Sequence, residues 1–235
     1  METIPTIEIY SSIECPFAYL SLYRLRQVWP EYAGRVRVVW RALSLEYINR
    51  ESTRKPLIEA ELDVIRQHIE PELPVLAWPR PAWEWPVTMW PAFEALACAQ
   101  AQGERAAFEM SWALRYGFFA RGRSPSLRHE ILAIAEEVAR ETELDVARLE
   151  EEWDSGHYKA RVLADSRRGW HDLRVNGSAT FVLPDGTQVT NPGLGELDFD
   201  EETFTLRGYE PPEEGALEVL QRLLGQRSSL SGSTM

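Results

Sequence analysis

One short stretch near the start of the chain most constrains the fold. Residues 6–10 alternate apolar and polar side chains as a strand does, and residues 16–29 carry apolar side chains largely on one helical face. Pro16 favours a helix that begins there, because proline lacks the N–H that would be unpaired in a first turn. Cys15 then precedes the helix, beside free N–H groups and the positive end of the helix dipole, which favour a thiolate. This pattern predicts a strand, a turn and a helix that present Cys15 as a nucleophile.

A second interpretation of Cys15 is that it is structural. A free cysteine is often a small buried hydrophobe, and the carboxylate of Glu14 beside it disfavours a second negative charge. Cys98, the only other cysteine, lies within an apolar helical stripe, so we predict that it is an inert thiol of the core.

The remaining pattern indicates an α/β protein with a long helical middle. Residues 35–43 are typical of a second strand, and a helical crossover of this length normally joins parallel strands. Residues 88–170 are predominantly helical. Residues 178–183 and 187–190 flank a Pro-Asp-Gly turn and predict a hairpin, and residues 217–224 predict a last amphipathic helix. Residues 194–210 match no regular pattern.

A segment crowded with proline and tryptophan, residues 71–91, interrupts the helices. Proline denies it regular structure, and its tryptophans are too many to leave in water: Trp78, Trp83, Trp85 and Trp90. Two interpretations stay open. The segment either walls an apolar ligand pocket, with Trp85 as a substrate-binding residue, or covers an edge of the core.

Composition excludes several classes of function. The net charge of −12 argues against a protein that binds nucleic-acid backbones, and no apolar run approaches the about 20 residues of a membrane span. The four histidines show no metal-binding spacing, so we expect no metal. Two cysteines are too few for a disulfide framework, which favours a reducing cytoplasm.

The order of elements and two motifs resemble the DsbA-like family of thioredoxin-fold proteins. The first motif is Cys-Pro-Phe-Ala-Tyr-Leu at residues 15–20, and the second is Gly-Ser-Ala-Thr-Phe-Val at residues 177–182. The chain is most similar to the FrnE-like branch, which neighbours 2-hydroxychromene-2-carboxylate isomerases and kappa-class glutathione transferases. The resemblance implies a thioredoxin fold with a large all-helical insertion. We expect a thioredoxin-like domain of residues 1–48 plus 171–225, an inserted helical domain of residues 49–170, and a disordered tail of residues 226–235.

Both motifs depart from the family pattern. Ala18 stands where dithiol members have a second, resolving cysteine, which closes the disulfide after the first exchange step. Ala179 stands where the family has a proline with a cis peptide bond, so the Ser178–Ala179 bond is either trans in a different loop or cis without proline.

The resemblance implies a catalytic Cys15, with Pro16, Phe17 and Ala18 around it and Ser178, Ala179 and Thr180 binding the substrate. The first hypothesis is a thiol–disulfide oxidoreductase that works with this single cysteine. The alternatives are a glutathione-dependent isomerase or transferase of kappa type, and a degenerate member that binds without catalysis. We expect no tightly bound cofactor, with glutathione as a candidate co-substrate. The expected partner is a small thiol or disulfide, not nucleic acid or a membrane, and a homodimer is left open.

Overall fold

A four-stranded sheet forms the centre of the computed structural model, which describes residues 4–225. The strands are β1 (Thr6–Ser11), β2 (Arg37–Ala42), β3 (Thr180–Val182) and β4 (Gln188–Thr190), in the order β2-β1-β3-β4. β1 pairs with β2 in parallel and with β3 in antiparallel register, and β3 and β4 form the hairpin expected from the Pro-Asp-Gly turn. The predicted strands and the parallel crossover are thus confirmed.

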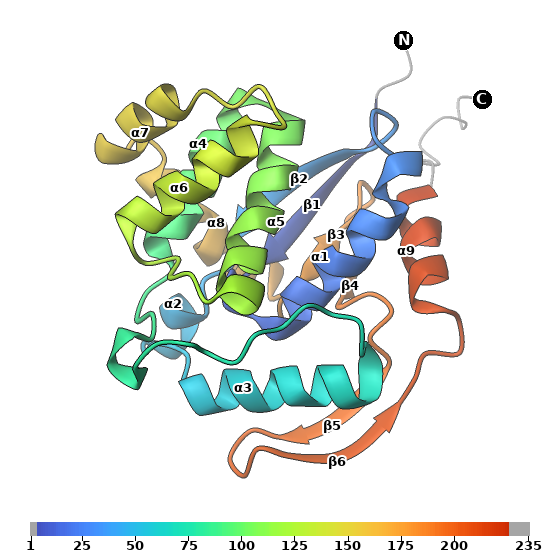
Figure 1. Ribbon diagram of the computed structural model, residues 1–235. Helices are drawn as coiled ribbons and strands as arrows, with labels where there is room; N and C mark the ends of the chain where they lie inside the picture. Colours follow the sequence, from blue (N-terminus) through green and yellow to red (C-terminus); the bar gives the residue numbers. More distant parts are fainter. Residues whose placement is uncertain (1–3, 226–235) are drawn as a thin grey trace, which may run out of the picture.

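Two helices lie side by side on one face of this sheet (Figure 1). They are α1 (Pro16–Val28), which continues into a 3-10 turn at Trp29–Glu31, and α9 (Ala216–Gly225). A π-helical segment, Arg168–Leu173, packs on the opposite face, where Trp170 and Leu173 meet the buried side chains of Tyr10 and Val182. The first strand is therefore buried on both faces, which fixes the turn that follows it.

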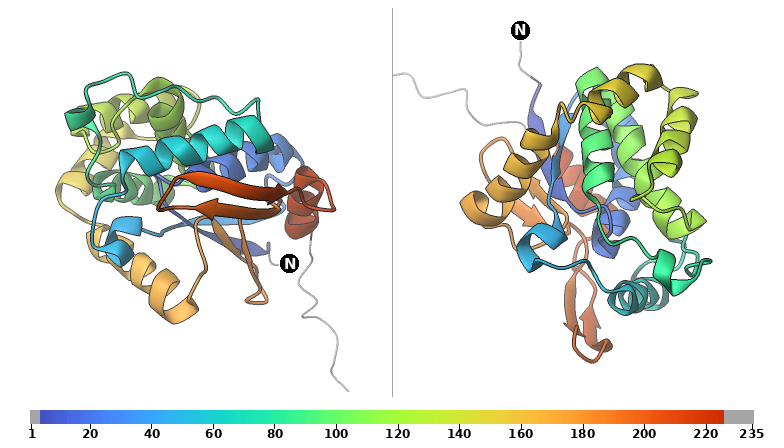
Figure 2. Two further views of the ribbon diagram at one scale, coloured as in Figure 1. Left: turned by 90° about the horizontal axis from the view of Figure 1, so that it is seen from below. Right: turned by 90° about the vertical axis from the view of Figure 1, so that its left-hand side faces the viewer.

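A helical insertion lies between β2 and β3 (Figure 2). Its helices are α2 (Leu45–Asn49), α3 (Lys55–Val64), α4 (Trp90–Gln102), α5 (Glu104–Arg121), α6 (Arg128–Ala139), α7 (Val146–Asp154) and α8 (Lys159–Arg167). α3 continues as a π-helical segment, Ile65–Ile69, and Ala82–Glu84 forms a single 3-10 turn in the otherwise irregular segment of residues 71–91. Fold class and helical insertion agree with the sequence prediction. Among the described residues, none of the helices is both long enough and apolar enough to cross a membrane.

The acidic stretch left unassigned by the sequence is an antiparallel hairpin of β5 (Glu196–Asp200) and β6 (Thr205–Glu210). It forms a separate two-stranded sheet that extends past α3, away from the central sheet (Figures 1 and 2). Leu197 and Phe199 of β5 are half-buried while Glu196 and Asp198 are exposed, so the strand alternation is present but interrupted by a bulge at Asp198/Phe199. The tail predicted to be disordered, residues 226–235, lies outside the described residues.

Candidate active site

Cys15 is placed by the join between β1 and α1. It has the extended backbone of an N-cap residue (φ −82°, ψ 119°), its carbonyl accepts the first helical hydrogen bond from Tyr19 N–H at 3.0 Å, and Pro16 occupies the first turn. The sequence-based prediction for this turn is confirmed. The side chain of Cys15 is only 8% exposed, so the thiol lies inside the protein rather than on its surface.

The loop before β3 faces the thiol across this join. Cys15 Sγ donates a hydrogen bond to the carbonyl oxygen of Ser178 at 3.2 Å, and the Ser178–Ala179 peptide bond is cis. Ser12 N–H donates to Ser178 Oγ at 2.8 Å, which fastens the two loops together. Of the two geometries left open by Ala179, the cis one is present, and Cys15 and Ser178 are in direct contact as predicted.

Asn191, which the sequence analysis did not single out, holds the far side of this loop. Its Oδ1 accepts a hydrogen bond from Ala179 N–H at 2.7 Å, and its own N–H donates to the Ala179 carbonyl at 2.7 Å. Thr180, in contrast, is turned into the hairpin: its hydroxyl donates to Gly177 O at 2.7 Å and lies 2.8 Å from the hydroxyl of Thr190. Thr180 therefore supports the loop, and its side chain contacts the hairpin instead of the thiol.

The helix N-terminus favours the Cys15 thiolate as expected, but burial outweighs this effect. Burial raises the pKa of the Cys15 thiol to about 12, and the negative charge of Glu61 on α3 adds to the rise. The N–H groups of Ala18 and Phe17 and a hydrogen bond from Ser178 lower this pKa, but they offset only part of the desolvation. The position of Cys15 at the start of the helix was predictable from the sequence. The depth to which its thiol is buried was not, because it depends on elements far away in the sequence.

Two carboxyl groups near Cys15 are also perturbed. Burial raises the pKa of Glu14 to about 7, although its Oε2 accepts a hydrogen bond from Ser12 Oγ at 2.5 Å. Burial likewise raises the pKa of Glu61 to about 8, with a further contribution from Glu201 in the β5–β6 turn. The site therefore holds three groups whose charged forms are disfavoured by desolvation.

One fully buried arginine, Arg115 of α5, lies beneath the turn that carries Cys15. Its guanidinium donates to Ser11 Oγ at 2.7 Å and to the Ser12 carbonyl at 3.1 Å. This residue is not among those singled out from the sequence. The available signal was its place among the apolar positions of the helix, next to Leu114 and four residues after Ser111, where an arginine is unusual.

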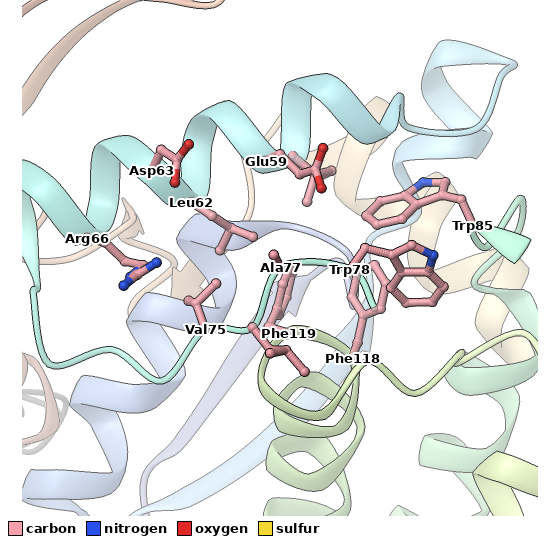
Figure 3. A pocket seen from close by; sticks show the side chains of 12 residues that line it. Glu59, Leu62, Asp63, Arg66, Val75, Ala77, Trp78, Trp85, Phe118 and Phe119 are labelled. Carbon is pink, nitrogen blue, oxygen red and sulfur yellow. The ribbon is translucent and has the colours of Figure 1, made fainter. Parts of the chain in front are cut away.

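Trp85 belongs to a separate feature, an apolar cleft of about 210 Å³ between α3, residues 75–85 and the end of α5 (Figure 3). Aromatic side chains form one wall: Trp78, Trp85, Phe118 and Phe119. Glu59 and Asp63 of α3 and Arg66 of the π-helical segment that continues it form the opposite side with Ile58 and Leu62. Cys15 does not line this cleft, but Tyr19, one helical turn after it, stacks on Phe119 with ring centroids 4.9 Å apart. Both interpretations of the tryptophan-rich segment fit this geometry, because Trp78 and Trp85 line the cleft and also pack against the core. That Trp85 binds a substrate stays a prediction.

Cys98 lies in α4, is 1% exposed, and is unbonded, as is Cys15. No disulfide thus joins the two cysteines. In residues 4–225, no three His, Cys, Asp or Glu side chains converge as a metal ion requires.

A parallel strand pair crossed over by a helix, an antiparallel hairpin beside it and a cysteine facing a cis peptide together define a thioredoxin-fold protein with a helical insertion. A family model for the DsbA-like thioredoxin domain matches residues 6–203, and the chain belongs to that family. A comparison with curated proteins yields no match.

Solved structures share this fold at low sequence identity. A putative protein disulfide isomerase from Nitrosomonas europaea has a TM-score of 0.63 and 16% identity, covering 94% of this chain and 96% of its own. The cytosolic disulfide reductase DsbM from Pseudomonas aeruginosa, solved with GSH, has a TM-score of 0.59 and 18% identity over 75% of this chain and 84% of its own. A 2-hydroxychromene-2-carboxylate isomerase has a TM-score of 0.57 and 16% identity over 79% of this chain and 88% of its own.

Proposed function

We propose that this protein is a thiol–disulfide oxidoreductase that works through the single nucleophile Cys15. The observation that carries the proposal is the 3.2 Å contact between Cys15 Sγ and the Ser178 carbonyl, at the start of α1. In the family that this chain resembles, the corresponding loop offers its backbone to an extended peptide or to glutathione. A substrate bound along this loop would therefore hold its sulfur beside Cys15.

The exchange step is a simple displacement. The Cys15 thiol loses its proton to solvent, and the thiolate attacks one sulfur of a small disulfide. The substrate S–S bond breaks, a new S–S bond joins Cys15 to one half, and the other half leaves as a thiolate that takes up a proton. The pair of electrons that formed the substrate S–S bond departs with the leaving sulfur, so no further oxidant is needed.

A second thiol must then release the bound half, and this chain offers none beside Cys15. Ala18 holds the position of the resolving cysteine, and Cys98 is buried in α4 without a disulfide. We propose that glutathione serves as the co-substrate that resolves the mixed disulfide. DsbM, which was solved with GSH, shares its fold with this chain, and this similarity of fold supports the choice.

Substrate access requires a local rearrangement. Cys15 Sγ donates to Ser178 O and is 8% exposed, so a disulfide sulfur reaches it only after neighbouring groups have moved. This movement also exposes the thiol to water, which removes part of the desolvation that keeps it protonated. We therefore expect opening of the site and ionisation of Cys15 to occur together.

A second candidate function, a glutathione-dependent isomerase or transferase, is favoured by the aromatic cleft. Trp78 and Trp85 form an edge-to-face pair with centroids 5.1 Å apart, and Phe118 lies 5.2 Å from Trp85. Apolar concavities of this kind bind small apolar molecules. In isomerase members of the family a serine occupies the place of Cys15, so a substitution at this residue separates the two functions.

The test compares Cys15→Ser with Cys98→Ser as a matched control, since both replace a buried thiol. The measured quantity is the rate of glutathione-dependent reduction of 2-hydroxyethyl disulfide, followed through glutathione reductase. We expect Cys15→Ser to fall to the uncatalysed rate and Cys98→Ser to keep the wild-type rate. Full activity of Cys15→Ser would contradict the proposal. Glutathione-dependent isomerisation that survives in Cys15→Ser would support the second candidate, and no catalysis in either assay would leave a binding protein.

A further inference from the structure

Arg115 carries a buried charge without a matching carboxylate. It is 1% exposed, and its four hydrogen bonds go to neutral groups: Ser11 Oγ, Ser12 O, Ser111 O at 3.0 Å and Ser111 Oγ at 2.8 Å. Within residues 4–225, no carboxylate oxygen lies within ion-pair distance of its guanidinium. A buried cation of this kind costs free energy unless a negative charge forms nearby.

The groups that act on this cation belong to the reactive turn. Burial lowers the pKa of Arg115 to about 10, and the two groups that oppose this lowering are first Cys15 and then Glu14. The inserted helix α5 therefore brings a positive charge to the turn that carries Cys15, where α1 and α5 pack together (Figure 1).

Hydrogen bonds also connect Arg115 to the loop that faces Cys15. Arg115 donates to the Ser12 carbonyl at 3.1 Å, Ser12 N–H donates to Ser178 Oγ at 2.8 Å, and Cys15 Sγ donates to Ser178 O at 3.2 Å. Arg115 is thus two residues away from the thiol along this chain of contacts, with Ser12 and Ser178 between them. Its guanidinium fixes the backbone on which both loops meet.

The other charged groups that face the site are acidic. Glu61 of α3 disfavours the thiolate of Cys15, and Glu46 of α2, which accepts a hydrogen bond from Thr88 at 2.8 Å, disfavours the carboxylate of Glu14. Arg115 is a cation that lowers the pKa of Glu14, and both Cys15 and Glu14 raise the pKa of Arg115.

We infer that Arg115 is a positioning residue for Cys15, whose positive charge offsets the thiolate that forms when the site reacts. The inference rests on the proposed function, in which Cys15 becomes negatively charged before it attacks a disulfide. When the new S–S bond has formed, the negative charge leaves with the departing thiolate, and Arg115 again faces only the Glu14 carboxyl. The inserted helical region then buries the site and also supplies a positive charge to it.

The experiment measures the rate at which Cys15 forms a mixed disulfide with oxidised glutathione at pH 8, in a Cys98→Ser background. Arg115→Gln keeps hydrogen-bond donors and removes the charge, and we expect it to slow the reaction about threefold or more, because loss of an opposite charge near a thiol raises its pKa. Arg115→Lys keeps the charge, and we expect it to recover most of the rate. The matched control is Arg24→Met, which removes another buried arginine, bonded to Glu70 and Gly193, and should leave the rate of the folded protein unchanged.

A pH profile separates charge from structure. Burial lowers the pKa of a lysine, so the advantage of Arg115→Lys over Arg115→Gln should disappear as the pH rises and the lysine loses its proton. A purely structural role would give a constant ratio between the rates of the two variants, and that result would overturn the inference. A wild-type rate in folded Arg115→Gln would also overturn it.

Failure of the proposed function can be told apart from failure of this inference. If the wild-type protein forms no mixed disulfide, the proposed function fails. The same comparison of variants by iodoacetamide alkylation of Cys15 still tests Arg115, because alkylation needs only the thiolate.

Discussion

Iodoacetamide is expected to alkylate Cys15 far more slowly at neutral pH than it alkylates a free cysteine. At pH 7 a thiol with a pKa of about 12 is ionised in on the order of one molecule in 100,000, against a few per cent for a free thiol of pKa about 8.5. Since only the thiolate reacts, the rate should rise about tenfold per pH unit from pH 6 to pH 8. The measurement is the alkylation rate in a Cys98→Ser background across this range.

The control for this profile is Cys15→Ser, which isolates Cys98. Burial also raises the pKa of Cys98 to about 12, so its residual alkylation should be slow and equally steep. A rate for Cys15 that is level from pH 6 to pH 8 would mean that the thiol is already ionised, as the helix N-terminus alone suggests, and would show that burial does not control this site.

Replacement of Tyr19 by alanine should cause the largest loss of stability among the residues of the Cys15–Leu20 motif. Tyr19 is 0% exposed, stacks on Phe119 and on Trp112 with centroids 4.9 and 5.5 Å apart, and donates from its hydroxyl to Pro74 O at 2.9 Å. Removing a buried aromatic side chain leaves a cavity and costs about 3–5 kcal/mol. Urea unfolding followed by circular dichroism should show this decrease in the free energy of unfolding.

Tyr19→Phe is the matched control, because it keeps the ring and removes only the hydroxyl. Loss of the hydrogen bond to Pro74 should cost about 1 kcal/mol. Equal losses for the two variants would mean that the hydrogen bond, and not the aromatic stack between α1 and α5, joins the first helix to the insertion.

Most of the fold could be predicted because its signals are local. The alternation in β1, the proline at the start of α1 and the Pro-Asp-Gly turn each specify their own neighbourhood, and the structure confirms all three. The β5–β6 hairpin could not be predicted, because its apolar positions are only half-buried, β6 contains a glycine, and the bulge at Asp198/Phe199 breaks the period. The domain boundaries proposed from the sequence stay predictions.

The site was predictable only as far as its motifs extend. Cys15 and Ser178 meet as expected, because the family motifs mark both sides of the contact. The burial of the Cys15 thiol and the contact of Arg115 with Ser11 depend on how α5, about a hundred residues later in the chain, packs against the first turn. No local sequence pattern predicts that packing. The substrate, glutathione as co-substrate and the oligomeric state likewise stay predictions.

Mass spectrometry after incubation with oxidised glutathione tests the central claim most directly. The protein is treated in its folded state, digested, and mapped for glutathionyl groups on the peptides of Cys15 and Cys98, with Cys15→Ser as the control. We predict one glutathionyl group on Cys15, none on Cys98, and none on the Cys15→Ser variant. The incubation is therefore prolonged and carried out at raised pH, where the thiolate fraction of a thiol with a pKa of about 12 increases about tenfold per pH unit, and an unmodified Cys15 under these conditions would contradict the account.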